Sequence, residues 1–85
     1  MLTYGFIGLG NMSTAIIKGM VASGDILPEQ IYGMNRSLQK TTQLAEQFAI
    51  QQTTSIVELM KCSDVIIIGV KLQNLEEVLP IIKEN

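Results

Sequence analysis

The sequence predicts an α/β fold, in which parallel strands form one sheet and helices cover both of its faces. Two observations carry this prediction. Short runs rich in β-branched and aromatic residues alternate with longer amphipathic stretches along all 85 residues, and a glycine-rich turn joins the first run to the first amphipathic stretch. A strand–helix order repeated four times requires right-handed crossovers between parallel strands, with helices on the two faces of the sheet.

The first strand and the first helix are expected on either side of the glycine turn. Residues 2–7 (LTYGFI) form a short apolar run that includes aromatic and β-branched side chains. In residues 11–23, apolar side chains recur at helical spacing: Met12, Ala15, Ile16 and Met20, with Ile17 and Val21 beside them. Gly24 follows where a left-handed helix end is needed, so a helix is predicted to end there.

Three further strand–helix pairs follow along the chain. Strands are predicted at residues 31–34, 49–52 and 64–70, and helices at residues 37–47, 54–61 and 74–83. Ser37 is a plausible N-cap for the second helix. The run 64–70 (DVIIIGV) holds four β-branched residues in succession, a pattern that predicts burial on both faces of the sheet.

Composition limits the classes of partner that this chain can have. Hydrophobic residues make up 47%, charged residues 16%, and the net charge is −2. No basic run is present, so a nucleic-acid or membrane-surface partner is not expected, and no apolar run is long enough to span a bilayer. The single cysteine, Cys62, fits a reducing, cytoplasmic setting, and we expect it to pack as a small apolar side chain.

The turn after the first strand carries the clearest functional pattern. Within residues 5–14 (GFIGLGNMST), Gly8, Gly10 and Ser13 occupy the positions of a G-x-G-x-x-G motif. Gly8 would allow the tight turn, Gly10 would let a pyrophosphate approach the backbone, and the small Ser13 would let helix and strand pack closely. Backbone N–H groups from Asn11 onward would face the anion. This predicts dinucleotide binding; the alternative is a purely structural turn.

The end of the second predicted strand favours NADP(H) over NAD(H). An NAD site normally has an acidic residue there, bonded to the ribose hydroxyls. This chain has Asn35, Arg36 and Ser37, with Lys40 one helical turn later and no carboxylate in residues 30–45. A 2′-phosphate would meet a guanidinium, a hydroxyl and a helix N-terminus. In the alternative interpretation, Ser37 caps the helix while Arg36 and Lys40 are solvated.

The end of the fourth predicted strand should border the same crevice. Gly69, Val70 and Lys71 lie there, and strands one and four are neighbours in the usual strand order of this fold. Gly69 would allow a cofactor to approach, and Lys71 could reach a phosphate or a ribose; alternatively, this is a strand end with an exposed lysine. Glu76 and Glu77 are predicted to be a solvated helix face.

The sequence offers no candidate catalytic residue or metal ligand set. It contains no histidine, so a Ser-His-Asp triad or a histidine-based metal site is impossible within this chain. No cluster of metal-ligating residues is visible. The functional signal is therefore confined to nucleotide binding.

Three segments together resemble the N-terminal domain of pyrroline-5-carboxylate reductases. They are GFIGLGNMSTAIIKGM, IYGMNRS and SDVIIIGVKLQ, and the resemblance covers nearly the whole chain. The opening run is the most specific, with Asn11 and Met12 after the second glycine. One position departs from the family pattern, because Leu72 stands where a proline is usual.

The resemblance implies a Rossmann-like parallel sheet that is incomplete, with the first βαβαβ half and one further βα unit. Residues 1–85 would be the N-terminal dinucleotide-binding domain, and the helical C-terminal domain for substrate binding and dimerisation would be absent. The implied reaction is NADPH-dependent reduction of the small molecule 1-pyrroline-5-carboxylate to L-proline, in a full-length parent that is a homo-oligomer. The alternatives are another NAD(P)-dependent dehydrogenase or a regulatory relative without catalysis.

The resemblance also divides the predicted cofactor-binding residues among the parts of the cofactor. It assigns the pyrophosphate to Gly8, Leu9, Gly10, Asn11 and Met12, the adenosine end to Asn35, Arg36 and Ser37, and the nicotinamide side to Val70 and Lys71.

Overall fold

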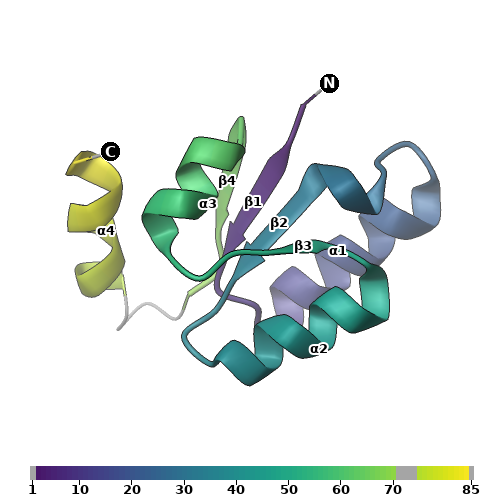
Figure 1. Cartoon of the computed structure of the whole chain (residues 1–85), viewed down its shortest axis with the longest axis horizontal. Helices are drawn as coiled ribbons and strands as arrows, with labels where there is room; N and C mark the ends of the chain where they lie inside the picture. The colour runs from purple at the N-terminus through teal and green to yellow at the C-terminus, as the bar shows by residue number, and fades with distance from the viewer. Residues whose placement is uncertain (1, 71–74, 85) are drawn as a thin grey trace.

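A four-stranded parallel sheet lies between two pairs of helices in the computed structural model, which describes residues 2–70 and 75–84 (Figure 1). The elements are β1 (Tyr4–Ile7), α1 (Asn11–Ser23), the 3-10 turn η1 (Pro28–Gln30), β2 (Ile31–Met34), α2 (Leu38–Phe48), β3 (Gln51–Gln52), α3 (Ile56–Cys62), β4 (Val65–Ile68) and α4 (Leu75–Glu84). The strand order is β3-β2-β1-β4, and every pair is parallel. The predicted Rossmann-like α/β fold is confirmed.

Alternation along β1 creates one apolar core on each face of the sheet. Phe6 packs with Ile17 of α1 and Leu44 of α2, whereas the next residue, Ile7, packs with Leu59 of α3 on the other face. Figure 1 shows the same division, with α1 and α2 on one side and α3 and α4 on the other. Each fully buried aliphatic side chain contributes about 1.5–3 kcal/mol, so these two clusters hold the helices to the sheet.

The strand register brings three carboxyl ends to one level. Ile7, the last residue of β1, pairs with Met34 of β2 and with Ile68 of β4, which are also the last residues of their strands. Two hydrogen bonds extend this alignment past the strands: Gly8 N–H donates to the Met34 carbonyl at 2.8 Å, and Gly69 N–H donates to the Ile7 carbonyl at 2.7 Å. The loops that follow these strands therefore meet at one edge of the sheet.

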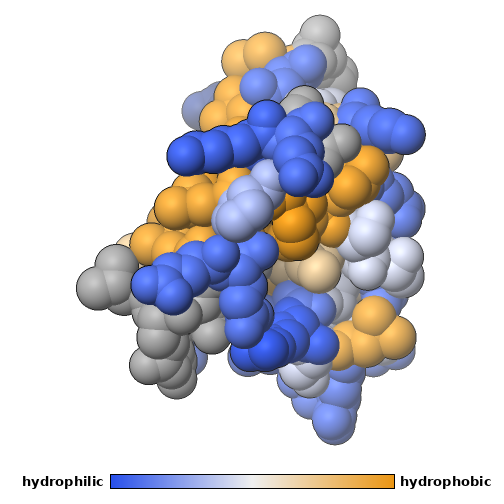
Figure 2. Space-filling model, turned by 90° about the vertical axis from the view of Figure 1, so that its left-hand side faces the viewer, coloured by the Kyte–Doolittle hydropathy of each residue, from blue (hydrophilic) through white to orange (hydrophobic). Residues whose placement is uncertain are grey.

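The prediction that the fourth strand is buried on both faces is wrong. β4 occupies an edge of the described sheet, and Val65 and Ile68 keep 38% and 41% of their surface exposed. Apolar surface is visible between polar side chains on the α4 side of the molecule (Figure 2). An edge position explains the difference, because a strand with a neighbour on one side alone is less completely covered.

Two smaller expectations fail in whole or in part. In α1, Ile17 is buried and Met20 and Val21 pack against the core, as expected, but Met12 is 77% exposed and Ile16 is also exposed. The glycine turn fixes where the helix begins, so it directs position 13 rather than 12 toward the sheet. Cys62 is exposed and does not pack in the core, because it is the last residue of α3.

Among the residues that the structure describes, no helix is long and apolar enough to cross a membrane.

Candidate nucleotide site

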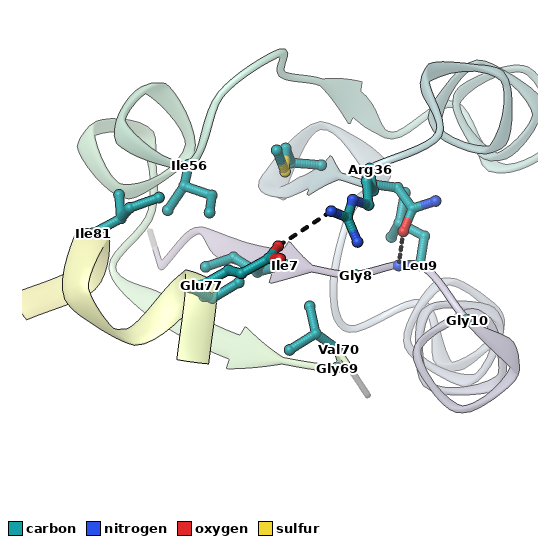
Figure 3. A pocket seen from close by; sticks show the side chains of 13 residues that line it. Ile7, Gly8, Leu9, Gly10, Arg36, Ile56, Gly69, Val70, Glu77 and Ile81 are labelled. Atoms are coloured by element: carbon teal, nitrogen blue, oxygen red, sulfur yellow. Dashed lines mark hydrogen bonds and ion pairs between the residues drawn. The ribbon is translucent and has the colours of Figure 1, made fainter. Parts of the chain in front are cut away.

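A cavity of about 420 Å³ opens at the carboxyl ends of β1, β2 and β4 (Figure 3). It is lined by Ile7, Gly8, Leu9, Gly10, Met34, Asn35, Arg36, Ile56, Gly69, Val70, Glu77, Val78 and Ile81. Its size is in the range of small-molecule sites in proteins. The three sequence segments that were singled out for cofactor binding all contribute to it.

Gly8 is the one position of the loop at which no other residue fits without strain. Its φ of +93° lies in the left-handed region, and a Cβ there would come within 2.9 Å of the Gly69 carbonyl carbon and of the Val70 nitrogen. Backbone atoms cannot move aside as a flexible side chain could. The absence of a side chain at Gly8 therefore lets the first loop lie directly against the end of β4.

Gly10 differs, because the fold itself does not require a glycine there. Its φ is −78°, an ordinary value, and a Cβ built on it would meet nothing within 4 Å. The residue is exposed, lines the cavity and is the N-cap of α1. Backbone left bare beside a cavity is what the close approach of a ligand requires.

Ser13 fulfils the packing role expected of the third motif position. It is buried, with 2% of its surface exposed, and its Oγ occupies the space that a Cβ on Gly69 would need. Small residues at 13 and 69 therefore allow α1 and the end of β4 to meet. The Ser13 side chain does not line the cavity, so what it can offer a ligand is its backbone N–H.

Asn11 and Met12 follow the glycine loop but do not line this cavity. Both residues are exposed. They lie in the first turn of α1, where backbone N–H groups have no partner inside the helix. No acidic residue is present in this turn, so the positive end of the helix dipole is available to an anion.

Asn35 connects the glycine loop to the end of β2. Its Oδ1 accepts a hydrogen bond from the Leu9 N–H at 2.9 Å, and Figure 3 shows this bond beside the cavity. The side chain therefore holds the loop in place as well as lining the cavity. Sequence reasoning placed Asn35 at the adenosine end and missed this bond, which joins residues 26 positions apart.

Arg36 reaches over the cavity and is paired with an acidic residue from α4. Its Nη2 lies 3.3 Å from Oε2 of Glu77, and the two side chains are 76% and 64% exposed. Figure 3 shows them pointing toward one another. Glu77 is solvent-exposed, as expected, but it also lines the cavity and brings a carboxylate to a place where the local sequence has none.

Ser37 is at the N-cap of α2, but its hydroxyl makes no capping hydrogen bond. Its backbone carbonyl accepts from Lys40 N–H at 3.1 Å and from Thr41 N–H at 3.4 Å instead. Ser37 is exposed next to Arg36 and does not line the cavity. Its hydroxyl is thus not committed to the helix.

The far side of the cavity is mostly apolar. Gly69 and Val70 line it at the end of β4, and Ile56, Val78 and Ile81 contribute from α3 and α4. Lys71 lies outside the described residues. The cavity thus combines a bare glycine loop, one charged rim formed by two side chains, and an apolar wall.

Comparison with known sequences defines the class of protein. The family described as NADP oxidoreductase coenzyme F420-dependent matches residues 3–85. The chain therefore belongs to this family of NADP-binding oxidoreductase domains.

The particular relatives are pyrroline-5-carboxylate reductases. The chain is 43% identical to that of Escherichia coli K12 over 67 residues, which is 79% of this chain and 25% of the relative. It is 32% identical to pyrroline-5-carboxylate reductase 2 of Bacillus subtilis over 86 residues, which is 95% of this chain and 31% of the relative. The chain thus spans a quarter to a third of the length of these relatives.

Solved structures give the same result. The structure of a pyrroline-5-carboxylate reductase from Coxiella burnetii matches with a TM-score of 0.89 and 31% identity, over 98% of this chain and 30% of that one. That of 1-pyrroline-5-carboxylate reductase from Streptococcus pyogenes matches with a TM-score of 0.75 and 35% identity, over 92% and 29%. The resemblance to the N-terminal NAD(P)-binding domain of these reductases is confirmed.

Proposed function

We propose that this chain binds NADPH and is the cofactor-binding part of an enzyme that reduces 1-pyrroline-5-carboxylate to L-proline. One observation carries the cofactor part of the proposal. The glycine loop is held in place by hydrogen bonds and packing on both sides, yet Gly10 remains bare toward the cavity with open space around it. The substrate part of the proposal rests on the relatives, which are named pyrroline-5-carboxylate reductases.

The pyrophosphate would lie over the glycine loop. Gly8, Leu9 and Gly10 line the cavity beside the N-terminus of α1, and the first-turn N–H groups of Asn11, Met12 and Ser13 would donate to its oxygens. These donors are fixed by the fold before the ligand arrives, because Leu9 is bonded to Asn35 and Gly8 to Met34. A preorganised loop loses little conformational freedom on binding.

The adenosine end would lie toward Arg36. The guanidinium suits a 2′-phosphate in both charge and shape, and the Ser37 hydroxyl is at the adjacent position. The apolar wall that includes Ile56 and Val78 offers a surface against which a flat nucleobase could pack. This arrangement supports NADPH in preference to NADH.

The nicotinamide would lie toward the end of β4, beside Gly69 and Val70, with Lys71 following them in the sequence. When bound, the reduced cofactor supplies a hydride to the carbon of the ring C=N bond. The chain's own residues position the cofactor, and none of the described residues is assigned as the catalytic acid. We expect the 85-residue chain to bind the cofactor without producing proline.

The test is a calorimetric titration of the 85-residue protein with NADPH and, in the same buffer, with NADH. Tighter binding of NADPH is expected, and Arg36→Gln should reduce this preference about tenfold through loss of a charge-assisted contact. Binding of NADH with equal affinity would remove the 2′-phosphate argument and keep the nucleotide site. Binding of neither cofactor by the folded protein would contradict the proposal for this chain.

A further inference from the structure

The pairing of Arg36 with Glu77 has a consequence for cofactor choice. Arg36 is the group that the proposed function assigns to the 2′-phosphate, and in this structure Glu77 of α4 holds its guanidinium at 3.3 Å. Both side chains line the cavity. A phosphate that bound Arg36 would therefore have to displace a carboxylate that is already there.

The surroundings of the pair make such an exchange feasible. Arg36 is 76% exposed and Glu77 is 64% exposed, so water and salt screen the attraction between them. A phosphate dianion carries more charge than a carboxylate and offers more acceptor oxygens to a planar guanidinium. The incoming phosphate can thus replace Glu77, although the loss of the existing pair reduces the net gain.

We infer that Glu77 is a specificity-determining residue, which weakens the preference for NADPH by competing with its 2′-phosphate for Arg36. The inference rests on the proposed function of the cavity. NADH has no 2′-phosphate, so it can bind while the Arg36–Glu77 pair stays intact. Glu77 therefore lowers the affinity for NADPH alone and brings the affinities for the two cofactors closer together.

Glu76 provides a matched control on the same helix. It precedes Glu77 in the first turn of α4 and has the same charge, but it does not line the cavity. Glu76→Gln and Glu77→Gln change the net charge of the protein equally. A difference between the two variants thus reports the position of the carboxylate and not the general electrostatic field.

The experiment titrates the wild-type protein, Glu77→Gln, Glu76→Gln, Arg36→Gln and the double variant Arg36→Gln/Glu77→Gln with NADPH and with NADH at low ionic strength. Circular dichroism first verifies that each variant is folded. Glu77→Gln should bind NADPH about threefold to fivefold more tightly than wild type, as expected for release of an exposed ion pair. Its affinity for NADH, and both affinities of Glu76→Gln, should change less than twofold. In the Arg36→Gln background, the gain from Glu77→Gln should disappear.

The other outcomes separate this inference from the proposed function. If NADPH binds and Glu77→Gln behaves as Glu76→Gln does, the competition is refuted while the nucleotide site stands. If Glu77→Gln weakens NADH binding, Glu77 contacts the ribose directly and the competition is likewise refuted. If no variant binds either cofactor, the proposed function and this inference both fail.

Discussion

The glycine loop and the Arg36–Glu77 pair border the same cavity but are held by different forces. Gly8 and Leu9 are buried, and hydrogen bonds and close packing attach the loop to β2 and β4. Arg36 and Glu77 are mostly exposed and are joined by a single ion pair. The geometry of this site is therefore fixed by the fold, whereas its selectivity depends on side chains that can change at little cost to the fold.

The largest effect expected from this comparison is on stability at Gly8. Gly8→Ala combines a positive φ with a Cβ that would come within 2.9 Å of backbone atoms of Gly69 and Val70, just after β4, so we expect it to lose about 3 kcal/mol or more of unfolding free energy. Urea denaturation followed by circular dichroism measures this loss. The control is Gly24→Ala, where φ is also positive, at +79°, but nothing lies within 4 Å; it should lose about 1 kcal/mol. Equal losses in the two variants would show that the contact with β4 is unimportant.

The next largest effect is expected at Asn35. Asn35→Ala removes the acceptor of the Leu9 N–H and leaves that group unpaired in a residue that is 1% exposed, at a cost of about 1–3 kcal/mol. Asn35→Asp keeps an acceptor oxygen of the same shape, so its stability should stay within about 1 kcal/mol of wild type, while its added negative charge should weaken NADPH binding. Thermal unfolding and calorimetry measure the two quantities. A stable Asn35→Ala protein would mean that the loop does not depend on the Asn35 side chain.

Gly10 tests the loop by affinity and not by stability. Gly10→Ala has an ordinary φ and open space for its methyl group, so the free energy of unfolding should change by less than about 1 kcal/mol. The same methyl group would stand where the pyrophosphate is proposed to lie, and we expect at least a roughly tenfold loss of affinity for both NADPH and NADH. Unchanged binding by calorimetry would place the pyrophosphate elsewhere.

The sequence predicted the structure of the glycine loop better than it predicted the contacts of Arg36 and Glu77 at the charged rim of the cavity. The roles of Gly8 and Ser13 follow from a local motif, since the turn, the strand before it and the helix after it are all adjacent in the chain. The ion pair joins Arg36, which precedes α2, to Glu77 on α4. The local sequence around either residue gives no sign of the partner. Residues 30–45 contain no acidic residue, but the fold brings the carboxylate of Glu77, from α4, next to Arg36.

The bond between Leu9 and Asn35 was missed for the same reason. The glycine motif predicts which backbone groups approach a ligand. It does not predict which side chain near a neighbouring strand accepts a hydrogen bond from the other backbone N–H groups of the loop.

The wrong prediction for β4 has a different origin. A continuous β-branched run predicts burial wherever such strands are central, and it carries no information about whether neighbouring strands are present on both sides.

The smallest effect is expected for the stability contribution of the rim. Arg36→Gln and Glu77→Gln should each change the free energy of unfolding by less than about 1 kcal/mol, because exposed ion pairs gain little over hydrated charges. The double variant Arg36→Gln/Glu77→Gln should likewise stay within about 1 kcal/mol of wild type by urea denaturation. A coupling of 1 kcal/mol or more in this double-mutant cycle would show that the pair is structural, since α4 would then be held to the end of β2 by the pair itself. A coupling below 1 kcal/mol that matches the NADPH affinity gained in Glu77→Gln would show that the pair acts on cofactor choice and contributes little to the fold.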